Sequence, residues 1–93
     1  MNIKNFSTIG YFIKNYFNGS MDYSDLESCI DDFFKWEKRE TVEAFKNEIE
    51  TMFILRDPDL FREVFYRLGD RGIPTQKAIP MVELLYARAW EHK

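Results

Sequence analysis

Apolar side chains recur every three or four positions along most of this 93-residue chain, which is the spacing of one buried face of an α-helix. No stretch alternates apolar and polar residues over a length that would predict a strand. Five stretches carry the helical pattern, and a chain of this length supports one hydrophobic core. The pattern predicts an all-α fold, a small single-domain bundle of about five helices over residues 1–93.

Local signals place the ends of the first two helices. The first covers residues 7–17, is weakened by one internal glycine, and ends where Asn18 and Gly19 allow a left-handed turn. The second begins at Ser24, which is expected to form a capping box with Glu27. In such a box each side chain accepts a hydrogen bond from the backbone N–H of the other residue.

The third helix is expected to bury an apolar stripe and to place Lys46 and Glu50 on the outside, where they can pair one turn apart. The fourth is entered through Asp57 as N-cap and Pro58 as its first residue. The glycines and the proline after it predict a loop containing at most one helical turn. These segments are the helices 39–55, 58–69 and 80–91 and the loop 69–79.

Composition narrows the class of partner. The formal net charge of −3 and the pI near 5.1 argue against direct binding to nucleic acid or to an anionic membrane, which clustered basic side chains hold. A basic protein is the better match. The single cysteine, the lack of a secretion signal and the lack of an apolar run long enough to span a bilayer predict a cytoplasmic protein.

The negative charge is concentrated in one segment. Residues 18–37 carry six carboxylates and one lysine, whereas the rest of the chain is neutral or slightly basic. At 100° per residue, the acidic positions of the second helix share one arc, and its apolar positions, Cys29 among them, share the opposite arc. The acids are therefore expected to form a surface.

Two interpretations of this surface remain open. A charged helix face often does no more than keep a protein soluble. Aromatic side chains lie among these carboxylates, however, and aromatic anchors surrounded by charge are typical of a tight interface. For Tyr16 and Trp36, packing in the core is an equally good interpretation. The candidate interface comprises Tyr16, Asp22, Tyr23, Asp25, Glu27, Asp31, Asp32 and Trp36.

Catalysis has little support in the sequence. The single histidine, His92, is next to the last residue, where a catalytic base or a metal ligand is hard to position. Cys29 lies on the apolar arc and is expected to be a buried thiol. No histidine and cysteine cluster has zinc spacing, and no calcium loop or phosphate-binding glycine loop occurs. We expect no catalytic residue, no cofactor and no metal, and hence no enzyme.

With these residues in view, the chain resembles the CdiI family, the small α-helical immunity proteins of bacterial contact-dependent growth inhibition. The similarity extends over most of the chain. The positions that carry it are Phe6, Ile9, Tyr16, Phe17, the acidic helix within residues 22–34, then Val42, Phe45, Glu48 and Ile49, and finally Leu68, Gly69 and the last helix with its tryptophan.

The resemblance implies a cytoplasmic antitoxin that binds a cognate CdiA-type C-terminal toxin domain as a heterodimer. Such toxins are often nucleases, frequently RNases acting on tRNA, and a nuclease needs basic side chains to hold phosphates. The acidic segment would then meet lysines and arginines of the toxin. The alternative is a non-enzymatic helical scaffold or regulatory module that acts by homo-oligomerisation through an apolar surface.

Overall fold

The computed structural model describes residues 2–91 and contains five α-helices and no strand within that range, so the predicted all-α bundle is confirmed. The helices are α1 (Ser7–Asn15), α2 (Leu26–Trp36), α3 (Arg39–Leu55), α4 (Pro58–Gly69) and α5 (Thr75–Glu91), with short 3-10 segments at Ile3–Phe6 and Tyr23–Asp25. None of the helices in the described part of the chain combines the length and the apolar character that crossing a bilayer requires.

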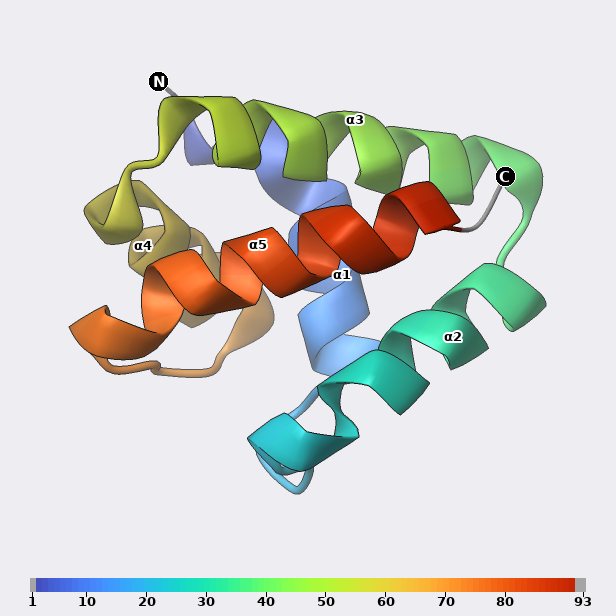
Figure 1. The fold of residues 1–93 in the computed structure, drawn as a ribbon, viewed down its shortest axis with the longest axis horizontal. Coiled ribbons are helices and arrows are strands. Elements are labelled where there is room, and N and C mark those ends of the chain that lie inside the picture. The colour runs from blue at the N-terminus through green and yellow to red at the C-terminus, as the bar shows by residue number, and fades with distance from the viewer. Residues whose placement is uncertain (1, 92–93) are drawn as a thin grey trace.

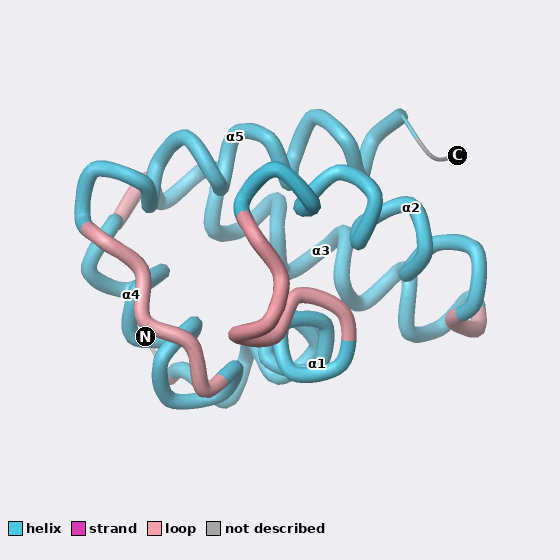
Figure 2. Tube along the Cα trace, turned by 90° about the horizontal axis from the view of Figure 1, so that it is seen from below, coloured by secondary structure: helices cyan, strands magenta, loops and turns pink. Residues whose placement is uncertain are grey.

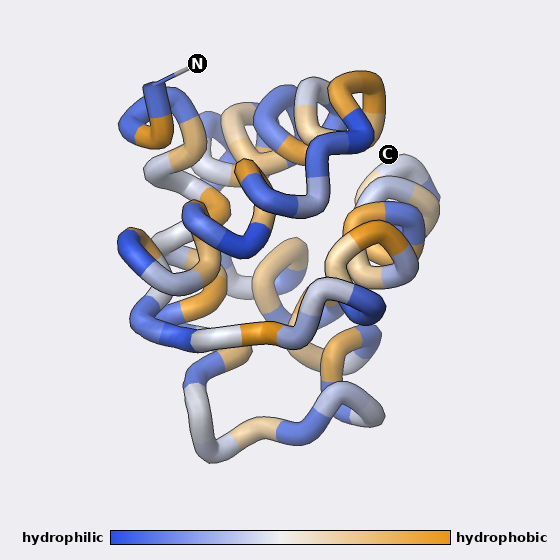
Figure 3. The backbone as a smooth tube through the Cα atoms, turned by 90° about the vertical axis from the view of Figure 1, so that its left-hand side faces the viewer, coloured by the Kyte–Doolittle hydropathy of each residue, from blue (hydrophilic) through white to orange (hydrophobic). Residues whose placement is uncertain are grey.

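Helix α5 runs across the middle of the molecule and contacts α3, which lies along the upper edge in Figure 1, and α1 crosses behind α5. Helix α4 lies at one end of this pair and α2 at the other. Figure 2, seen from below, shows α1 almost end-on beneath α5. Apolar positions recur between polar ones along each helix (Figure 3), which is why each helix can bury one side.

The core is built mainly from aromatic rings. Seven of the nine phenylalanines are fully buried. Phe33 of α2 lies against Phe12 of α1 and Phe45 of α3, with ring centroids 5.4 and 4.7 Å apart. Phe12 and Phe45 also contact each other at 5.1 Å. This trio fastens α2 to the rest of the bundle.

Two glycines set the distance between α1 and α4. A Cβ atom on Gly10 would lie 2.5 Å from Cβ of Leu68 and 3.1 Å from its backbone. A Cβ atom on Gly69 would lie 2.6 Å from Cγ2 of Ile13. The crossing is therefore reciprocal, because each helix offers a glycine to a large side chain of the other. Gly10 looks like a weak point of its helix, yet it is what lets the two helices approach.

The end of α1 differs from the prediction. The helix ends at Asn15, and the N–H of Phe17 is shared between the carbonyl oxygens of Phe12 and Ile13, so the last turn widens. Gly19 has no positive φ, so the expected left-handed exit is wrong. The left-handed residues are instead Arg56 and Asp70, which follow α3 and α4.

The start of α2 also differs. The chain makes a 3-10 turn at Tyr23–Asp25 before the α-helix begins at Leu26. Asp22 is the extended residue before that turn, and its N–H donates to Oδ2 of Asp25 at 3.0 Å. The capping pair is therefore Asp22 and Asp25, and the expected pair of Ser24 and Glu27 is wrong.

Helices α3 and α4 have the predicted bounds, but α5 begins at Thr75, well before Pro80. Burial of Ile73 and Ala78 draws the preceding segment onto the core. Pro80 lacks the N–H that would bond to the carbonyl of Gln76, and Gln76 is exposed, so water can replace that bond. The expectation of a loop up to residue 79 is wrong for this reason.

Lys46 was expected on the outer surface of α3, but only 8% of it is exposed. Its Nζ lies 4.4 Å from the centroid of the Trp90 ring on α5. The apolar stem of a lysine can be buried while its ammonium contacts an aromatic face. Lys46 therefore belongs to the contact between α3 and α5.

We predict that Gly10→Ala lowers the free energy of unfolding by about 1–3 kcal/mol, because the added methyl group overpacks the crossing by more than the helix propensity of alanine returns. Chemical denaturation measures this. Gly72→Ala is the control, because nothing lies within 4 Å of a Cβ there and its φ is not positive. Equal stability of the two variants would contradict the role given to Gly10.

A carboxylate of α3 caps the start of α1. Oε1 of Glu48 accepts the backbone N–H of Ile9 at 3.0 Å, one of the first-turn N–H groups that lack a partner within their own helix. Partial burial raises the pKa of Glu48, although hydrogen bonds from Thr8 and Ile9 oppose that rise. Glu48 thus joins the two helices by a polar contact.

Because this pKa is raised, the folded state binds the proton more tightly than the unfolded state does. The contribution of Glu48 to stability therefore falls as pH rises through the raised value. We predict that wild type gains stability relative to Glu48→Gln as pH is lowered from neutral toward the ordinary value of 4.5. Denaturant unfolding of both proteins across that range measures the difference, and the opposite slope would refute the assignment.

Candidate functional site

The predicted acidic surface of α2 is divided into two flanks. Asp31 faces α5, where Arg88 donates to both of its carboxylate oxygens, Nε to Oδ1 at 3.0 Å and Nη2 to Oδ2 at 2.6 Å. The hydrogen bond to Asp31 is the main cause of a raised pKa of Arg88, and the charge of Glu27 adds to it. Glu27 and Asp31 form the α5-side flank, whose charge Arg88 partly neutralises.

The other flank carries Asp25, Asp32 and Trp36 and is called the α1-side flank. Burial raises the pKa of the Cys29 thiol, and the charges of Asp25 and Asp32 raise it further. Asp32 also contributes to the raised pKa of Tyr16, the residue that follows α1. Trp36 follows Asp32 by one helical turn and therefore projects from the same flank. Its side chain is 70% exposed.

The two predicted tyrosine anchors are half-buried. Tyr16 stacks on Phe12, with ring centroids 6.1 Å apart and an interplanar angle of 11°, and its hydroxyl donates to Oε2 of Glu37. The Tyr23 ring lies 6.1 Å from that of Phe17. These two rings therefore pack against the bundle, whereas Trp36 is exposed to solvent.

Glu37 follows α2 directly and was missing from the predicted site. Its Oε2 accepts hydrogen bonds from two hydroxyls, that of Tyr11 in α1 at 2.9 Å and that of Tyr16, directly after α1, at 2.5 Å. The bond to Glu37 is the main cause of a raised pKa of Tyr11, and burial followed by this bond raises that of Tyr16. Glu37 is 26 positions from Tyr11 and 21 positions from Tyr16. No local sequence pattern therefore predicts these two hydrogen bonds.

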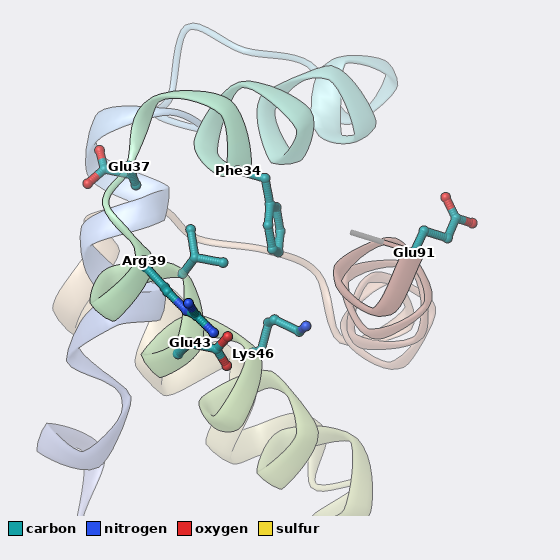
Figure 4. A pocket seen from close by; sticks show the side chains of 7 residues that line it. Phe34, Glu37, Arg39, Glu43, Lys46 and Glu91 are labelled. Carbon is teal, nitrogen blue, oxygen red and sulfur yellow. The ribbon is translucent and has the colours of Figure 1, made fainter. Parts of the chain in front are cut away.

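Two clefts border Glu37. The larger, about 720 Å³, lies between α2, α3 and the end of α5. Figure 4 shows the Phe34 ring pointing into it and the Lys46 side chain directed toward α5, while Glu91 and the carboxylate of Glu37 point away. The smaller, about 350 Å³, lies between the start of α1 and the turn into α3. It is lined by Ser7, Thr8, Tyr11, Glu37, Lys38 and Thr41.

Arg71, in the segment between α4 and α5, is a second residue missed by sequence reasoning. Its Nη1 donates to the carbonyl oxygens of Phe17, Asn18 and Met21 at 3.3, 2.5 and 2.8 Å. Its guanidinium also lies over the rings of Phe17 and Tyr23, at 4.1 and 5.3 Å from the centroids. Arg71 therefore fixes the loop that leads into the acidic segment.

The remaining residues that could act in catalysis or hold a metal ion include Cys29 and His92. Cys29 is buried with 3% of its surface exposed, as predicted, and its raised pKa keeps the thiol protonated. His92 lies outside the described residues. Within residues 2–91 no group of three or more histidine, cysteine or carboxylate side chains is arranged to hold a metal ion.

Searches of family models, of curated proteins and of solved structures find no match for this chain. The resemblance to the CdiI family therefore stays a prediction.

We predict that Arg71→Ala destabilises the protein by about 2–4 kcal/mol, because charge-assisted hydrogen bonds and cation–π contacts are lost together. Arg71→Lys should recover only part of this, since an ammonium lacks the planar fork. Denaturant titration gives the values. Arg67→Ala serves as control, because its pair with Glu63 is exposed and contributes little. Similar losses at both arginines would show that the carbonyl contacts of Arg71 are unimportant.

Proposed function

We propose that the protein is an immunity protein, an antitoxin that binds and neutralises a cognate contact-dependent growth inhibition toxin domain. The toxin would be a basic nuclease of the RNase or tRNase kind. The observation that carries the proposal is the α1-side flank. There the exposed Trp36 lies one helical turn after Asp32, on the same side of α2 as Asp25. An exposed tryptophan among carboxylates suits a basic protein surface, because the ring supplies contact area and the charge supplies attraction.

The position of this flank supports the proposal further. Phe33 and the Tyr16 to Glu37 hydrogen bond hold α2 on α1, so the flank is presented on a rigid support. A binding surface that is ordered beforehand loses less entropy on association. The α5-side flank contributes less attraction, because Asp31 already pairs with Arg88.

We assign no catalytic step to the protein. Inhibition would follow from occupancy alone, with carboxylates of α2 taking the positions that phosphates of the toxin's substrate would occupy. Asp22, Glu27 and Asp32 are exposed, and they are the carboxylates best placed for that part.

A second candidate, a scaffold that self-associates, is favoured by a different observation. Ile54 and Leu55 at the end of α3 and Tyr66 on α4 are 70%, 42% and 67% exposed. Large apolar side chains that stay exposed are typical of contact surfaces. Association through them would depend little on salt, which separates this candidate from the charge-driven one.

The test uses two matched double variants. Asp32→Lys/Trp36→Ala reverses one charge and removes one aromatic ring on α2, and Glu63→Lys/Tyr66→Ala does the same on α4. The tagged protein is co-purified with the product of the reading frame immediately upstream, and binding is titrated at low and high salt. We predict a stoichiometric complex that weakens with salt and loses at least about 30-fold in affinity with the α2 variant.

The α4 variant should bind the toxin as wild type does. If no complex forms and sedimentation shows a salt-independent dimer that only the α4 variant dissociates, the scaffold is correct and the immunity proposal is wrong. Thermal unfolding of both variants checks that they fold.

A further inference from the structure

Glu37 is a carboxylate whose orientation is fixed by hydrogen bonds from two tyrosines. It directly follows α2, with its N–H bonded to the carbonyl of Phe33 at 3.0 Å. Tyr11 and Tyr16 both donate to the same oxygen, Oε2. Two donors on one oxygen fix the orientation of the whole carboxylate group. Its direction is therefore set before any partner arrives.

The second oxygen, Oε1, receives no hydrogen bond from residues 2–91, and none of the ion pairs in that range includes Glu37. The group is nevertheless half-buried, where a charge interacts more strongly than it does in open solvent. A half-buried carboxylate with one oriented oxygen left over is a ready acceptor for a cation.

The smaller cleft shows where such a cation would enter. Glu37 and Tyr11 line it together, and Tyr11 is 43% exposed. Its volume of about 350 Å³ is enough for one long side chain. The hydroxyls of Ser7, Thr8 and Thr41 in its lining can accept further N–H groups. Lys38 also lines the cleft but is exposed, so its ammonium can turn to solvent.

We propose that this cleft takes an arginine side chain of the partner, with the guanidinium donating to Oε1 of Glu37 and packing on the ring of Tyr11. A planar guanidinium suits this setting better than an ammonium, because it donates in a fixed plane and stacks on aromatic faces. An anion is disfavoured because it would face the carboxylate. This inference rests on the proposed function, since it names the group that the basic partner inserts beside the α1-side flank.

The first experiment needs no partner protein. The full chain is titrated with N-acetyl-arginine methylamide and observed by amide chemical shifts. The citrulline counterpart, which has the same shape without the charge, is the ligand control, and inorganic phosphate tests for anion binding. We expect saturable shifts around Thr8, Tyr11 and Glu37 with the arginine compound alone. These shifts should vanish in Glu37→Gln, whose amide oxygen still accepts from the tyrosines, and persist in Glu43→Gln.

Several results of this titration would overturn the inference. They are shifts spread evenly over the carboxylates of the chain, shifts that Glu37→Gln leaves unchanged, and a response to phosphate in place of arginine. The Glu43→Gln control is exposed and lines only the larger cleft, so loss of binding in that variant would equally contradict the site.

The second experiment separates this inference from the proposed function. In the toxin complex, Glu37→Gln should weaken binding by about 10- to 100-fold, the usual effect of losing a charge-assisted hydrogen bond. A complex that forms but is insensitive to this variant would refute the arginine site and leave the immunity function standing. Arginine binding without any toxin complex would refute the immunity function and leave the cleft as a cation site.

Discussion

The close crossing of α1 and α4 is the constraint on which the rest of the structure depends. Gly10 and Gly69 let the two backbones approach, and Ile13 and Leu68 fill the space that the missing side chains leave. With α1 held there, its outer side presents Tyr11 and Tyr16 to the end of α2, and its first turn presents the N–H of Ile9 to α3. The candidate site therefore lies on one side of α1, and the contact with α4 that fixes the position of α1 is on the opposite side.

Fewer carboxylates of residues 18–37 are available to a partner than the net charge of that segment suggests. Asp31 is engaged by Arg88, Asp25 caps the start of its own helix, and Glu37 is bound by two tyrosines. The fold therefore uses half of the six carboxylates to fasten α2. What remains for a partner is the three exposed carboxylates Asp22, Glu27 and Asp32, together with the exposed Trp36 and the oriented carboxylate of Glu37.

Sequence reasoning succeeded where the determining contacts are local. Asp57 accepts the N–H groups of Asp59 and Leu60 at the start of α4, and such a cap can be predicted from four consecutive residues. The early start of α5 escaped prediction because burial of Ala78 outweighs the interruption at Pro80. Local propensity is a weak guide whenever a segment has a core to join.

The residues of the candidate site and its support that were missed depend on distant partners. Arg71 meets carbonyl oxygens about fifty positions away, and Glu37 meets hydroxyls on another helix. Both are charged residues in or beside turns, a type that sequence alone assigns to solvent. Lys46 was misplaced for the same reason, since its contact with Trp90 spans two helices. The acidic surface was predicted, but its division into two flanks required the position of α5.

The single cysteine can report local opening of the bundle. Cys29 lies on the buried side of α2, and a reagent that modifies thiols can reach it only when that helix lifts from its neighbours. The rate of modification therefore reports how often α2 opens while the rest stays folded, a local free energy distinct from that of global unfolding. A partner bound to the α1-side flank would lower this rate of modification without contacting the sulfur.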